Sequence, residues 1–168
     1  ASNAEPDPVA AALAAETAGA HGITAHLRVD RRHIQEPDVR SLKERIATKL
    51  NLEMGNSPEI VEVALDILPD DVCLVPENRR EVTTEGGLDC AEQKASLRPT
   101  ITCLRESGIV VSLFIDPDEV QVVAAADLGA QFIELHTGAL ANSSGADREI
   151  ELARLIRAAE LAHGAGLE

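Results

Sequence analysis

A short basic segment stands out in an acidic chain. Residues 26–34, HLRVDRRHI, hold two histidines, three arginines and one acid, whereas the 168-residue chain has a formal net charge of −14. Arg can bind a phosphate through two parallel N–H donors, and His can give or take a proton near neutral pH. We therefore interpret His26, Arg28 and His33 as groups that bind an anionic small molecule, with phosphate as the expected anion.

Two neighbouring arginines have a simpler interpretation. Arg31 and Arg32 lie within reach of acidic residues along the chain, which are Asp30, Glu36 and Asp38. Surface arginines of this kind usually pair with carboxylates and add little to stability or function. We expect Arg31 and Arg32 to be ion-paired surface residues.

Further ionisable residues follow apolar runs elsewhere in the chain. They are Glu53, Glu77, Asp116, Glu134 and His136. Carboxylates and imidazoles at the C-terminal ends of parallel strands form the active sites of α/β enzymes, where they can act as general acids and bases. Each one alone could instead be structural, for instance Glu53 in an ion pair with Arg28. Five at one predicted edge favour a catalytic site.

The elements that must position these residues alternate along the chain. Five apolar runs are the predicted strands, at 22–27, 49–54, 72–77, 109–116 and 132–138. Helical segments separate them, with start signals at Asp7–Pro8, Ser57–Pro58 and Asp116–Pro117, and stop signals at Gly19 and Gly129. This βα repeat predicts an α/β fold with a parallel sheet, either doubly wound or a (β/α) barrel.

The two ends of the sequence suggest a barrel that continues beyond them. Residues 7–19 form a predicted helix with no strand ahead of it, and GAGLE at 164–168 repeats the helix-to-strand passage of 128–134. We expect one domain over 1–168, a partial (β/α)8 barrel from helix 1 to helix 6 with strands 2–6. Residues 1–5 are expected to be a tag or a disordered start.

Composition excludes several classes of protein. The excess of acid argues against binding nucleic acid or an anionic membrane, and no apolar run approaches the ~20 residues of a spanning helix. Cys73, Cys90 and Cys103 lack CxxC spacing, which favours a reducing cytoplasm without disulfides or zinc, and Cys73 in an apolar run is expected to be a buried thiol. Two Phe, with no Trp or Tyr, leave ligand binding to charge and hydrogen bonds.

A polar loop after the third predicted strand adds hydroxyl groups. The segment ENRREVTTEGGLDC, residues 77–90, contains Thr83 and Thr84 followed by Gly86 and Gly87. Hydroxyls can bind a ligand, and glycines let the backbone turn close to it, although an ordinary turn would have the same composition.

Taken together, the motifs GITAHLRVDRRHI, NLEM, CLVPE, EVTTEGGLD, VSLFID and FIELHTG closely resemble those of pyridoxine 5′-phosphate synthases, from about Pro6 to Leu167. The resemblance implies a cytoplasmic, cofactor-free (β/α)8 TIM barrel that assembles as a homo-octamer. It implies a condensation of two small phosphorylated substrates, 1-deoxy-D-xylulose 5-phosphate and 3-amino-2-oxopropyl phosphate. The products are pyridoxine 5′-phosphate, inorganic phosphate and water.

The resemblance also implies a role for individual residues. It makes His26 and Glu53 proton acceptors and Glu134 a stabiliser of the transition state, while Arg28, His33 and Thr83 hold the deoxyxylulose phosphate. The family's first-strand N-x-D-H motif has no counterpart here, and its proton-donor Gly-His-Gly motif would begin after Glu168. Residues 1–168 alone are therefore expected not to complete the reaction.

Two other functions fit the same pattern. One is a different phosphosugar enzyme on a barrel, but a Schiff-base aldolase needs a lysine at a strand end, and Lys49 begins its strand. The other is an inactive truncated barrel that binds only phosphate or partner subunits.

Overall fold

Five parallel strands form one sheet in the computed structural model, which describes residues 6–77 and 86–168. The strands lie in the order β1-β2-β3-β4-β5, so each one pairs with the next along the chain. Their bounds are Gly22–Leu27 (β1), Lys49–Met54 (β2), Asp71–Leu74 (β3), Val110–Ile115 (β4) and Phe132–Leu135 (β5).

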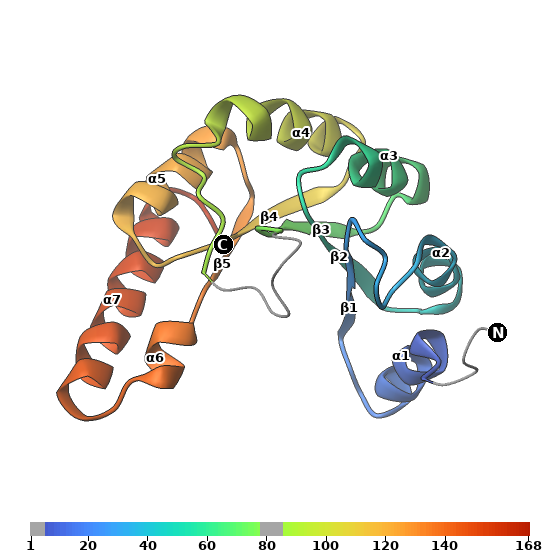
Figure 1. The fold of residues 1–168 in the computed structure, drawn as a ribbon, viewed down its shortest axis with the longest axis horizontal. Helices are drawn as coiled ribbons and strands as arrows, with labels where there is room; N and C mark the ends of the chain where they lie inside the picture. Colours follow the sequence, from blue (N-terminus) through green and yellow to red (C-terminus); the bar gives the residue numbers. More distant parts are fainter. Residues whose placement is uncertain (1–5, 78–85) are drawn as a thin grey trace.

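The helices form an outer arc around this sheet (Figure 1). Their bounds are Pro8–Thr17 (α1), Glu36–Arg45 (α2), Pro58–Ile67 (α3), Lys94–Glu106 (α4), Glu119–Leu128 (α5), Gly138–Asn142 (α6) and Gly145–Gly164 (α7). From α1 to α5 each helix contacts the next, and α5 contacts α7. A doubly wound sheet carries helices on both faces, whereas sequential strands inside one arc of helices are the arrangement of a (β/α)8 barrel. The fold is therefore of the barrel type.

The alternation of side chains along each strand separates the core from the inner face. Leu27, Met54, Leu74 and Leu113 stand in register across four strands and are fully buried on the helical side. Burying each such side chain stabilises the fold by roughly 1.5–3 kcal/mol. The residue before each of them therefore faces the inner side of the sheet, away from the helices.

Several of the predicted boundaries are confirmed. The strands at 22–27 and 49–54 have the expected bounds. The first helix begins at Pro8, and Asp7 caps it by accepting hydrogen bonds from the amides of Val9 and Ala10 at 3.0 Å. Gly129 ends α5 in a left-handed conformation.

One predicted helix start is wrong. The Asp116–Pro117 pair does not begin a helix, because α5 starts at Glu119 with Asp118 as its N-cap residue. The Asp116 carboxylate binds His136 instead, so a residue that resembles a helix cap belongs to the strand-end cluster. The third and fifth strands are also shorter than predicted, ending at Leu74 and Leu135.

The last residue pairs with β5. The Glu168 amide donates to the carbonyl of Gln131 at 3.1 Å, and the Glu168 carbonyl accepts from the amide of Ile133 at 3.0 Å. This is the pairing of a parallel strand. The prediction that residues 164–168 pass from helix to strand is thereby confirmed. Within residues 6–77 and 86–168, none of the helices combines the length and apolar character needed to span a bilayer.

Candidate active site

A row of polar side chains crosses the inner face of the sheet. His26 stands opposite Glu53, Glu53 opposite Cys73, and Cys73 opposite Ser112, each pair on neighbouring strands. Glu134 of β5 joins the end of this row, because the Ser112 hydroxyl donates to its Oε1 at 3.3 Å. A hollow of about 300 Å³ touches Ser112 and Glu134, but it lies toward the N-terminal ends of the strands, where Lys49, Asp71 and Phe132 line it.

His26 and Glu53 are close enough to exchange a proton through a small adjustment. The Nδ1 atom of His26 lies 3.7 Å from Oε2 of Glu53. Burial lowers the pKa of His26 below its ordinary 6.5, and the positive charge of Arg28 lowers it further, against an opposing effect of Asp30. His26 is therefore a neutral imidazole at pH 7. Its buried Nε2 has no hydrogen-bond partner among the described residues.

Glu53 is shifted in the opposite direction. Burial raises the pKa of its carboxyl above the ordinary 4.5, and the negative charge of Glu134 raises it further. Two carboxylates that repel each other on one face cannot both be ionised at low cost. Glu53 is thus a better proton acceptor than a solvated carboxylate, and Glu134 supplies part of that basicity.

Cys73 lies in the row between Glu53 and Ser112. Its side chain is fully buried, and this burial raises the pKa of its thiol well above the ordinary 9.0. The neighbouring charges of Glu134 and Glu53 add to the shift. A thiol that stays protonated is a weak nucleophile. Cys73 therefore fills space in the row, as the sequence predicted for a buried thiol.

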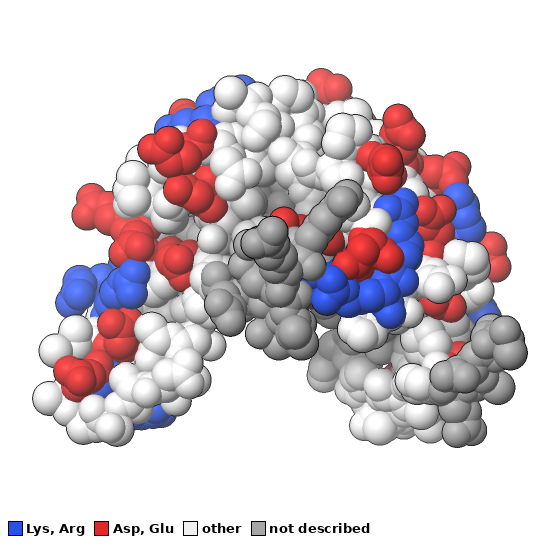
Figure 2. All heavy atoms as spheres, in the orientation of Figure 1, with Lys and Arg blue, Asp and Glu red and all other residues white. Residues whose placement is uncertain are grey.

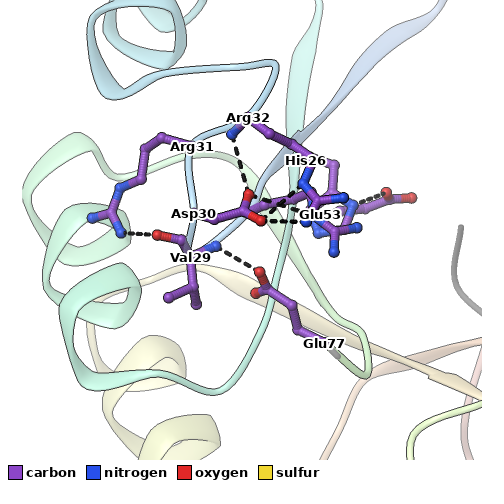
Figure 3. A network of polar contacts seen from close by, with 8 residues as sticks. His26, Val29, Asp30, Arg31, Arg32, Glu53 and Glu77 are labelled. Atoms are coloured by element: carbon purple, nitrogen blue, oxygen red, sulfur yellow. Dashed lines mark hydrogen bonds and ion pairs between the residues drawn. The ribbon is translucent and has the colours of Figure 1, made fainter. Parts of the chain in front are cut away.

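The basic segment forms the loop between β1 and α2. Arg28 is 8% exposed, and its Nε lies 3.8 Å from Oδ1 of Asp30. Asp30 also accepts from Nε and Nη2 of Arg32 at 2.8 and 2.5 Å (Figure 3). Lys and Arg atoms gather beside acidic ones in this part of the molecular surface (Figure 2). Asp30 thus stands between two arginines of one loop.

The interpretation of Arg31 and Arg32 as ion-paired residues is confirmed. Arg31 pairs with Glu36 at 2.8 Å and with Glu59 at 3.5 Å, and Arg32 pairs with Asp30. Asp38, a third predicted partner, accepts a hydrogen bond from the Gln35 amide at the start of α2.

A second imidazole–carboxylate pair lies at the strand ends. His136, just after β5, approaches Asp116, just after β4, with 2.9 Å between Nδ1 and Oδ1. The ring of His136 also packs against Phe114 at a centroid distance of 5.4 Å. The sequence placed both residues at strand ends, but their pairing depends on two strands that only the fold brings together.

The structure brings four of the six predicted site residues to one region. His26, Glu53 and Glu134 share the inner face, and Arg28 follows the same strand as His26. His33 is exposed in the loop that carries Arg28, and Thr83 lies outside the described residues.

This arrangement suits repeated proton transfers next to a bound anion. A neutral imidazole and a carboxylate of raised pKa are effective bases near neutral pH, and a nearby guanidinium can hold a phosphate. Within residues 6–77 and 86–168, no three His, Cys, Asp or Glu side chains are grouped to hold a metal ion.

Comparison with known proteins identifies the family. A family model described as "Pyridoxal phosphate biosynthesis protein PdxJ" matches residues 1–168. The chain is 56% identical over 166 residues to a pyridoxine 5′-phosphate synthase of Akkermansia muciniphila, covering 99% of this chain and 68% of that protein. It is 57% identical over 164 residues to proteins of the same name from Synechococcus sp. and Thermosynechococcus vestitus, covering 97% of this chain and 69% of each relative. The chain belongs to the PdxJ family of pyridoxal phosphate biosynthesis proteins.

Proposed function

We propose that this protein is a pyridoxine 5′-phosphate synthase. It condenses 1-deoxy-D-xylulose 5-phosphate with 3-amino-2-oxopropyl phosphate and yields pyridoxine 5′-phosphate, inorganic phosphate and water. The observation that carries this proposal is the shared inner face of His26, Glu53 and Glu134, in a chain whose relatives bear that name.

The roles proposed for these residues follow from their surroundings. Ring closure from an amine and a ketone needs several proton transfers, and His26 and Glu53 are the proton acceptors. The pKa shifts support this assignment, because the lowered pKa keeps His26 in its neutral, proton-accepting form and the raised pKa makes the Glu53 carboxylate a stronger base. Glu134 stabilises positive charge that develops on the reacting nitrogen, which requires a carboxylate but no proton transfer.

The sugar phosphate binds at the basic loop. Arg28 supplies a planar pair of N–H donors from a nearly buried position, and His33 and Thr83 complete the contacts. The enzyme acts in the cytoplasm as a homo-oligomer, an octamer by resemblance to its family. None of the proposed steps uses a cofactor.

The direct test is product formation from the two acyclic phosphates. Residues 1–168, and a form extended at both ends toward the length of the relatives, are each incubated with both substrates, and pyridoxine 5′-phosphate and inorganic phosphate are quantified by chromatography and a phosphate assay. Equimolar release of the two products supports the proposal. If the extended form binds deoxyxylulose phosphate by calorimetry but shows no turnover, the result would instead favour a protein that only binds phosphate. Conversion of the sugar phosphate alone would indicate a different phosphosugar enzyme.

A further inference from the structure

Glu77 connects two segments that are far apart in the sequence. It follows β3, yet its Oε1 accepts a hydrogen bond from the amide of Val29, in the loop after β1, at 2.6 Å (Figure 3). The strand between them in the sheet is β2, so the Glu77 side chain must pass over the end of that strand. The other carboxylate oxygen, Oε2, is buried without a hydrogen-bond partner among the described residues.

The residue at the end of β2 makes this path possible. Gly55 follows directly after Met54, and a Cβ atom built on Gly55 would lie 2.6 Å from Oε2 and 3.0 Å from Cβ of Glu77. The backbone of Gly55 does not need a positive φ, so here glycine supplies space rather than conformational freedom. A side chain at position 55 would therefore collide with Glu77 and disturb its contact with the loop.

The anchored amide lies in the middle of the basic loop. Val29 follows Arg28, and the Arg31 amide donates to the carbonyl of Arg28 at 3.0 Å, which closes a tight turn. Arg31 adopts a left-handed conformation with φ of 51°. One backbone hydrogen bond to a carboxylate at the centre of such a turn limits how far Arg28 can move.

We propose that Glu77 is the positioning residue that holds the β1–α2 loop in the conformation that binds the sugar phosphate. This inference rests on the proposed function, since it takes deoxyxylulose phosphate as the ligand of Arg28. Glu77 touches the loop backbone and acts through Arg28. Its attraction to the charge of Arg32 adds a second link to the same loop.

Three variants test the role. Glu77→Ala removes the acceptor and should weaken binding of deoxyxylulose phosphate about tenfold, the scale of a hydrogen bond to a charged group. Glu77→Gln keeps an oxygen acceptor of the same length and should lose less. Gly55→Ala displaces the carboxylate while leaving it in the sequence, and should weaken binding as Glu77→Ala does. The matched control is Glu59→Gln, since the contact of Glu59 with the same loop is to the Arg31 side chain and not to the backbone of Val29.

Two readouts separate positioning from a general loss of stability. Calorimetry gives the Kd for deoxyxylulose phosphate, and steady-state kinetics give the KM for each substrate. We expect the KM for the sugar phosphate to rise and that for 3-amino-2-oxopropyl phosphate to stay unchanged. Hydrogen exchange at the Val29 amide, followed by NMR without ligand, should accelerate in Glu77→Ala and remain slow in Glu59→Gln.

The failure of this inference differs from failure of the proposed function. If the unaltered protein binds no deoxyxylulose phosphate, the proposed function and the ligand named here are both wrong. If it binds and Glu77→Ala retains the same Kd, or the Val29 amide exchanges at the same rate, the role of Glu77 alone is overturned. Equal losses for both substrates would likewise overturn it, because they indicate general damage.

Discussion

His26 and Glu53 face each other from neighbouring strands, with Nδ1 and Oε2 3.7 Å apart. Burial lowers the pKa of the imidazole and raises that of the carboxyl, so their proton affinities move toward each other. Groups with similar proton affinities exchange a proton at little cost, which suits a reaction with several proton transfers.

Replacing the imidazole should remove catalysis and leave the fold intact. We expect His26→Asn to lower kcat by about 10²-fold or more, the usual contribution of a general base. The free energy of unfolding should change little, because Nε2 of His26 has no hydrogen-bond partner among the described residues. Steady-state kinetics and urea unfolding measure the two quantities. His163→Asn, at an exposed position, is the control, and a kcat within threefold of the unaltered protein would contradict the role of His26.

Neutralising Glu134 should lower the pKa of Glu53. The repulsion from Glu134 raises that pKa, so the carboxylate form of Glu53 is lost as the pH falls through a value above the ordinary 4.5. In Glu134→Gln the repulsion is absent, and the loss should occur at lower pH. Carboxyl ¹³C NMR of Glu53 against pH measures the shift. Ser112→Ala keeps the charge of Glu134 and should leave the titration closer to its original position; an unchanged or higher pKa in Glu134→Gln would refute the coupling.

Arg28 should not be replaceable by lysine. Arg28→Lys keeps the positive charge and loses the planar fork that binds two phosphate oxygens at once. We expect the KM for deoxyxylulose phosphate to rise about tenfold, and steady-state kinetics test it. Arg31→Lys is the control, since Arg31 is held by Glu36 and Glu59. Similar effects of the two variants would show that the loop needs charge without a specific contact.

Gly87, in the polar loop after β3, should contribute to stability because it has no side chain. A Cβ atom on Gly87 would lie 2.1 Å from the amide nitrogen of Asp116 and 2.3 Å from the carbonyl carbon of Ile115, and backbone atoms cannot move aside as side chains do. We expect Gly87→Ala to lower the free energy of unfolding by about 1–3 kcal/mol, the cost of overpacking.

Urea unfolding of Gly87→Ala should be compared with that of Gly164→Ala. A Cβ atom on Gly164 would meet no atom within 4 Å, and the residue lies at the end of a helix. Alanine there should leave stability unchanged or raise it by up to about 1 kcal/mol. A Gly87→Ala protein as stable as the parent would show that β4 and the segment after Gly86 are less closely packed than the structure indicates.

Local signals in the sequence were sufficient for most elements of the fold. The strand at 22–27 begins with Gly22 and precedes a basic loop, and Asp7–Pro8 starts a helix as its local chemistry dictates. The spacing of strands could not distinguish a barrel from a doubly wound sheet, because it does not say on which face each helix packs. The strand order decided that question.

Part of the candidate site could also be predicted from the sequence. Strand-end positions identified His26, Glu53 and Glu134, because parallel strands bring their C-terminal ends to one edge. Glu77 and Val29 are 48 positions apart in the sequence, and their contact depends on the lack of a side chain at Gly55, so no local pattern predicts it. The helix start predicted at Asp116–Pro117 was wrong, because a carboxylate before proline looks the same at a helix start and at a strand end, whereas the strand-end prediction for Asp116 agrees with its contact with His136.

The most direct test of the shared inner face is an NMR titration of the histidine side chains with 1-deoxy-D-xylulose 5-phosphate. The chain contains five histidines, and His21, before the start of β1, and His163, near the end of α7, are both exposed and do not follow a strand. Saturable changes at the resonances of His26 and His33, with none at His21 and His163, are the predicted result. Unchanged His26 signals at saturating ligand, or equal changes at all five histidines, would contradict a sugar-phosphate site on this face.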